Sequence, residues 1–162
     1  MPATPERIDT ATRLIAAAPD AVYRVWIDPD ALALWLPPKG MTCRIETFEA
    51  RPGGHFRMVL TYLDPADGHH GKFAEGEDAV EGRFVALEPG RLIVQDIVFG
   101  SGDPAFAGTM RMTWTLAPSG AGTQVTIAAE NVPSGITPQD HAAGLAASLE
   151  NLAAYVELRP MA

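Results

Sequence analysis

The sequence predicts an α+β fold in which an antiparallel sheet packs against a long C-terminal helix. Six successive segments between residues 43 and 130 alternate apolar and polar side chains with a period of two, as strands with one buried face do. Residues 137–158 return to helical spacing and carry an apolar stripe. A sheet with one apolar face needs a cover, and this helix is the element best suited to provide it.

The N-terminal part of the chain predicts one strand and two short helices. We expect residues 1–8 to form a flexible tail and residues 10–17 to form the first strand. Pro19 suits the first position of a helix, and apolar residues follow it at helical spacing. A second helix is expected over residues 29–36, and Pro37 ends it.

The middle of the chain reads as a run of antiparallel strands. The pattern is clear in the fifth of the six, where Met110, Met112 and Trp114 face one way while arginine and threonine face the other. The expected strands cover residues 43–50, 55–63, 79–87, 91–99, 109–116 and 123–130.

The last helix is predicted from both its start and its buried face. Thr137 can cap it, with a proline at its first position. Leu145, Leu149, Leu152 and Val156 recur at steps of four, three and four, which places them on one side of the helix.

Composition limits the class of protein. The 162 residues suit one domain, expected over residues 9–160, and no apolar run approaches the ~20 residues that span a bilayer. The net charge of −8 argues against binding to nucleic acid or to anionic membranes. Cys43 is the only cysteine, so no intramolecular disulfide and no cysteine-rich zinc site can form. The N-terminal apolar run is too short for a signal peptide, and we expect a cytoplasmic protein.

The paired glycines in "EARPGGHFRM" allow two interpretations, a phosphate-binding loop or a tight turn. A phosphate loop normally leads into a helix, whose free N–H groups meet the anion. Gly53 and Gly54 lead instead into a strand pattern that starts at His55. The sequence therefore favours a hairpin turn that uses glycine for its positive φ.

The longer loops are expected at one end of the sheet, because successive turns of a meander alternate between its two ends. Phe73 and Phe106 lie in two of these loops. We expect Trp35, His141 and Leu145 to meet the loops around one opening, where function is usually placed. The loops in question are residues 37–41, 64–77, 100–108 and 131–136.

Four stretches of the chain resemble the SRPBCC (START-like) superfamily, and more narrowly the homologues of the C-terminal domain of the activator of the heat-shock-protein-90 ATPase. They are "APDAVYRVWIDPDALALWLPP", "ARPGGHFRM", "EGRFVALEPGRLIV" and "DHAAGLAASLENLAAYVE". The resemblance covers residues 10–158 and implies a helix-grip (Bet v 1-like) fold, a curved sheet wrapped around the last helix. It also implies a cavity for lipids or other hydrophobic molecules. The chain departs from the family at Gly144-Leu145, where Gly-Trp is common.

The resemblance and the strand pattern together predict the residues of a ligand site. Most are apolar or aromatic side chains of the inner sheet face and the last helix, and two are ionisable. The candidates are Trp35, Met58, Phe73, Phe84, Asp96, Met110, Met112, Trp114, His141, Leu145 and Leu149.

Two polar features allow alternatives. Gln95 and Asp96 interrupt an apolar strand, and one of them must face inward, where it either orients a ligand or is satisfied within the protein. His69 and His70 suggest a metal pair, but adjacent residues in a solvated loop are the commoner explanation. We expect neither a metal nor a cofactor.

The leading functional hypothesis is binding of a small hydrophobic or amphipathic ligand, and the sequence leans against catalysis without deciding it. A second hypothesis, by analogy with the named relative, is a module that stimulates a chaperone ATPase. A third is a cyclase or hydrolase-like enzyme that uses His141 or Asp96. The exposed edges of the sheet also make a homodimer plausible.

Overall fold

The computed structural model describes residues 7–37, 40–62, 77–99 and 104–157. Its elements follow the predicted order of strand, two helices, six strands and long helix. They are β1 (Ile8–Ile15), α1 (Pro19–Ile27), α2 (Pro29–Trp35), β2 (Met41–Phe48), β3 (His55–Tyr62), β4 (Glu77–Glu88), β5 (Leu92–Phe99), the short 3-10 helix η2 (Pro104–Phe106), β6 (Met110–Ser119), β7 (Gly122–Glu130) and α3 (Pro138–Glu157).

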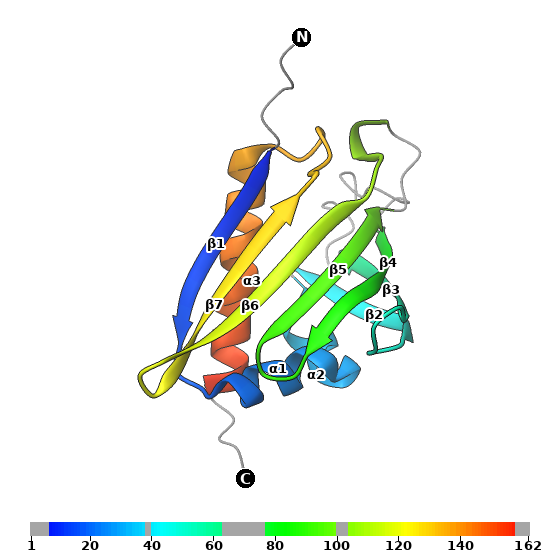
Figure 1. The fold of residues 1–162 in the computed structure, drawn as a ribbon. Coiled ribbons are helices and arrows are strands. Elements are labelled where there is room, and N and C mark those ends of the chain that lie inside the picture. The colour runs from blue at the N-terminus through cyan, green and yellow to red at the C-terminus, as the bar shows by residue number, and fades with distance from the viewer. Residues whose placement is uncertain (1–6, 38–39, 63–76, 100–103, 158–162) are drawn as a thin grey trace.

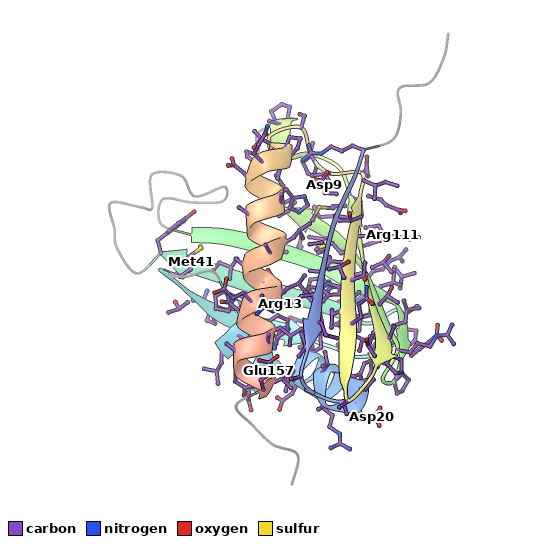
Figure 2. The ribbon with its side chains drawn as sticks, turned by 90° about the vertical axis from the view of Figure 1, so that its left-hand side faces the viewer. Asp9, Arg13, Asp20, Met41, Arg111 and Glu157 are labelled. Atoms are coloured by element: carbon purple, nitrogen blue, oxygen red, sulfur yellow. The ribbon has the colours of Figure 1, made fainter. Side chains whose placement is uncertain are left out.

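The seven strands form one antiparallel sheet in the order β1-β7-β6-β5-β4-β3-β2. Strands β2 to β7 make the predicted meander, and β1 adds to its far edge by pairing with β7. The sheet curls around α3, which lies along β1 and β7 in Figure 1 and stands beside β1 in Figure 2. The α+β helix-grip prediction is confirmed.

The ends of β1 differ from the prediction because its partner strand decides them. The strand begins at Ile8 and ends at Ile15, two residues earlier than expected at each end. Ile8 faces Glu130 and Ile15 faces Thr123, so the whole of β1 is paired with β7. Ile8 therefore belongs to the sheet and not to the expected tail.

The paired glycines form the predicted hairpin turn between β2 and β3. Gly53 has a φ of 83°, and a Cβ at Gly54 would collide with the backbone oxygen of Glu49. The Gly53 amide donates to the carbonyl oxygen of Phe84 at 2.7 Å. Because neighbouring backbone already uses this amide, the turn is no phosphate loop.

The last helix is built as its sequence predicts. The Thr137 hydroxyl accepts a hydrogen bond from the Asp140 amide at 3.1 Å, which caps the N-terminus. The four residues of its predicted stripe are buried, each no more than 3% exposed. None of the helices in the described ranges combines the length and apolar character needed to cross a bilayer.

Candidate functional site

A cavity of about 690 Å³ lies between α3 and the inner face of strands β3 to β6. Pockets for small molecules usually measure roughly 300–1,000 Å³, so this one is large enough for such a ligand. Met58 of β3 and Met110 and Met112 of β6 line the sheet side, and Leu145 lines the helix side. Their side chains face the cavity because alternate residues of a strand point to the same face.

The mouth of the cavity is formed where two loops meet the start of α3. Phe106 of η2 and Ile136 both line it. The amide of Gly135 donates to the carbonyl oxygen of Ala105 at 2.6 Å, which ties the two loops together. The described residues 104–108 and 131–136 therefore lie at one end of the sheet, as expected for these two loops.

Gln95 is the polar residue of β5 that faces inward. It is only 3% exposed, lines the cavity and lies between Phe84 and Met112 on the neighbouring strands. Its side-chain amide makes no hydrogen bond to any other part of the chain that the structure describes. Because the residue lines the cavity, this amide is placed to exchange hydrogen bonds with a polar atom of a bound molecule.

Asp96 lies on the opposite, outer face of the sheet, and its placement in the ligand site was wrong. Its carboxylate accepts two hydrogen bonds from Arg111 of β6, at 2.8 and 3.0 Å. These bonds hold the pKa of Asp96 below its ordinary value. Figure 2 shows Arg111 on the strands, far from α3.

His141 lines the cavity on the first turns of α3, and its ring is held by β1. Its Nδ1 atom lies 2.7 Å from the carboxylate of Asp9. Arg7 donates to the same carboxylate from Nε at 3.1 Å and from a terminal nitrogen at 2.7 Å. The Arg7 hydrogen bonds, and to a lesser degree that of His141, lower the pKa of Asp9, although partial burial opposes them. Figure 2 shows Asp9 on β1 next to the upper turns of α3.

The floor of the cavity is aromatic. Trp26 of α1 and Trp114 of β6 line it and meet edge to face, with ring centroids 5.5 Å apart. Both rings are at most 2% exposed, and within the described residues their Nε1 atoms have no hydrogen-bond partner. Trp35 packs behind them, 6.0 Å from Trp114, so it supports the floor from outside.

Four of the predicted site residues do not line this cavity. Trp35 is buried at the end of α2, and its Nε1 donates to the Val25 carbonyl oxygen at 2.9 Å, which holds the ring against α1. Phe84 is fully buried against Phe48 and Phe56, with ring centroids 5.5 and 5.3 Å away.

Leu149 is 2% exposed in the core one turn beyond Leu145, past the end of the cavity. Asp96, the fourth, lies outside as described above. Phe73, like the pair His69 and His70, lies outside the described residues. Within those residues no three His, Cys, Asp or Glu side chains gather as metal ligands would.

Several lining residues were missed by sequence reasoning. Ile97 and Phe99 lie two and four residues after Gln95 on β5, so their side chains face inward as it does. They would have been predicted once the inward-facing residue of β5 was known. Trp26 is one of the apolar residues that follow Pro19 at helical spacing, and only the tertiary packing brings it to the cavity floor. Phe106 was noted as a loop aromatic, which was the available signal for its place at the mouth.

Comparison with known proteins identifies the family. Residues 16–157 match the family model described as "Activator of Hsp90 ATPase homolog 1-like protein". The chain belongs to this family. The comparison with curated proteins found no match to this chain.

Solved structures of similar proteins share this fold. A protein from Chromobacterium violaceum is 35% identical, with a TM-score of 0.81 over 93% of this chain and 96% of its own. A protein from Mycobacterium smegmatis at 17% identity (TM-score 0.71, covering 99% of each chain) shares the fold. So does an AHSA1-like protein from Aeromonas hydrophila at 21% identity, with a TM-score of 0.70 over 94% of this chain and 93% of its own.

Proposed function

We propose that this activator-homologue family member binds a small hydrophobic or amphipathic molecule in the cavity between the sheet and α3. The observation that carries the proposal is the cavity of about 690 Å³, whose walls are mostly apolar and whose sheet side carries one amide side chain, Gln95. An interior space of this size is normally filled by side chains, since protein interiors are close-packed. An open space with mostly apolar walls and few polar groups is typical of a ligand site.

Burial of apolar ligand surface would supply most of the affinity, at roughly 25 cal/mol for each Å² removed from water. The three methionines at the sheet side suit ligands of varied shape, because an unbranched thioether side chain readily adopts new rotamers. Gln95 and His141 are the polar groups that would orient the ligand.

The first test is native mass spectrometry of freshly purified protein, followed by solvent extraction of any bound molecule. We expect a defined mass above that of the chain, which extraction removes and identifies as a largely apolar compound. A clean chain mass, together with no binding of added apolar fluorophores at high concentration, would contradict the proposal.

Filling the cavity from the helix side should block binding. We expect Leu145→Trp to weaken binding of an apolar fluorophore at least about tenfold, because the indole would occupy ligand space; this corresponds to about 1.4 kcal/mol. Leu14→Trp on the exposed outer face of β1 is the matched control, since Leu14 is 62% exposed. Circular dichroism should show both variants folded. Unchanged affinity in the Leu145 variant would place the ligand elsewhere.

The remaining functional hypotheses keep their own tests. The chaperone hypothesis rests on the family description, and pull-down of a chaperone with stimulation of its ATPase would favour it. An enzyme acting in the cavity would now depend on His141, since Asp96 lies on the outer face. A homodimer stays a prediction that sedimentation velocity would test.

A further inference from the structure

We propose that the pair Asp9–His141 forms a subsite for the hydroxyl group of a neutral ligand, such as a phenol or an alcohol, whose apolar body lies in the cavity. This inference rests on the proposed ligand-binding function and names the chemical class of its ligand. Asp9 is a positioning residue, and His141 Nε2 is the atom that would contact the ligand.

The hydrogen bond between the two side chains fixes the tautomer of His141. The Asp9 carboxylate is ionised and already accepts two hydrogen bonds from Arg7, so it has no proton to give to His141. The Nδ1 atom of His141, 2.7 Å away, must therefore carry the proton. In the neutral imidazole this leaves Nε2 with its lone pair free to accept a hydrogen bond.

The position of the pair makes this acceptor available to a ligand. The side chains of His141 and Asp9 are only 11% and 12% exposed, so most of the bulk water that would compete for the ring is excluded. His141 lines the cavity near its mouth, whereas Asp9 lies behind it on β1. The carboxylate therefore orients the ring without occupying ligand space.

The charges around the cavity favour a neutral ligand. No lysine or arginine of the described residues lines it, whereas Asp140 does so at the mouth. A carboxylate ligand would meet this negative charge and would have no proton to donate to Nε2. The polar group further inside, Gln95, is an uncharged amide. A hydroxyl provides the donor without the charge.

Three naphthalene probes of similar size test the subsite: 2-naphthol, its methyl ether and 2-naphthoate. We expect the wild-type protein to bind 2-naphthol about threefold to tenfold more tightly than the ether, which lacks the donor, and naphthoate least tightly. His141→Leu should remove the preference for naphthol, so that naphthol and its ether bind with equal affinity. Asp9→Ala should reduce it, because the ring loses the partner that fixes its tautomer.

A matched control and a second measurement protect the test from effects on folding. The double variant Glu49→Ala and His55→Leu removes another His–carboxylate pair, 3.5 Å apart at an exposed turn, and should leave all three affinities unchanged. The ¹⁵N shifts of the His141 ring should report a protonated Nδ1 in the wild type and a shift toward protonated Nε2 in Asp9→Ala. This measurement shows whether Asp9 fixes the tautomer, and the probe affinities show whether Nε2 meets the ligand.

The outcomes separate this inference from the proposed function. Equal binding of naphthol and its ether, a preference that survives His141→Leu, or tighter binding of naphthoate would overturn the hydroxyl subsite and leave the cavity function in place. A wild-type ring protonated on Nε2 would do the same. Failure of all three probes to bind would overturn both.

Discussion

At the scale of single residues, Cys43 shows how burial changes the chemistry of a side chain. This thiol, the only one in the chain, lies on β2 and is partly buried. Its pKa is raised from 9.0 to about 11, because burial disfavours the thiolate. Since the thiolate is the reactive form, the folded protein should protect Cys43 from alkylation.

We expect iodoacetamide to modify the native protein about a hundredfold more slowly than the unfolded protein at mildly alkaline pH, since two pKa units reduce the thiolate fraction by that factor. Mass spectrometry over time, with and without guanidinium chloride, measures both rates. Cys43→Ser gives the background. Equal rates in the two states would show that the thiol is neither buried nor shifted.

At the scale of one element, α3 combines a buried stripe with a weak point. Leu145, Leu149 and Leu152 attach the helix to the core, each no more than 3% exposed. Gly144 directly precedes Leu145 in the helix interior, where glycine lowers helix stability relative to alanine. A Cβ at Gly144 would meet no atom within 4 Å, so alanine fits without strain.

Gly144→Ala should therefore raise the free energy of unfolding by about 0.4–1 kcal/mol, through a smaller loss of backbone entropy on folding. Urea denaturation measures the change. Gly54→Ala is the contrasting variant and should destabilise by more than about 1 kcal/mol, because its Cβ would collide with backbone at Glu49. A destabilised Gly144 variant would mean that α3 packs more tightly here than described.

At the scale of the whole molecule, ion pairs lie on the outer face of the sheet, and a hydrogen bond between Asp9 and His141 joins β1 to α3. The carboxyl pKa values of Asp9, Glu46, Glu49 and Asp96 all lie below their ordinary values, and hydrogen bonds are the first cause of each shift. A carboxyl whose pKa is lower in the folded state stabilises the fold above its unfolded pKa. This stabilisation is lost as the pH falls through the folded pKa.

The free energy of unfolding should therefore decline as the pH drops below the ordinary carboxyl values of 4.5 and 3.8. Urea midpoints measured from neutral to acid pH test this. The double variant Asp9→Asn and Asp96→Asn should show a shallower decline, since these two side chains are the less exposed, at 12% and 15%. A decline as steep as that of the wild type would assign the acid sensitivity to other groups.

Much of the fold was predictable because it depends on local spacing. A period of two identifies strands, and steps of three and four identify helices, wherever the chain later places them. The cap at Thr137 and the turn at Gly53 were predicted for the same reason, since each needs only a few neighbouring residues. The methionines of β3 and β6 were assigned to the cavity wall from strand parity and family resemblance together.

The orientation of β5 shows where this local information ends. Apolar residues occupy both of its faces, so the alternation alone does not tell whether Gln95 or Asp96 is buried. Pairing with β4 and β6 decides it, and places Asp96 opposite Arg111 on the outer face. The wrong assignments of Trp35 and Phe84 have the same origin, because a buried aromatic fits a cavity and a packed core equally well in sequence.

The sequence by itself determined the kind and order of the elements and, except for strands such as β5 that are apolar on both sides, the face that each one buries, because these follow from the spacing of neighbouring side chains. Only the tertiary structure brought Asp9 to His141, 132 positions away, by pairing β1 with the last strand and laying α3 beside it. Contacts between distant parts of the chain leave no periodic signal in the sequence. The cavity depends on such contacts, because its walls come from seven separate elements and the loops between them.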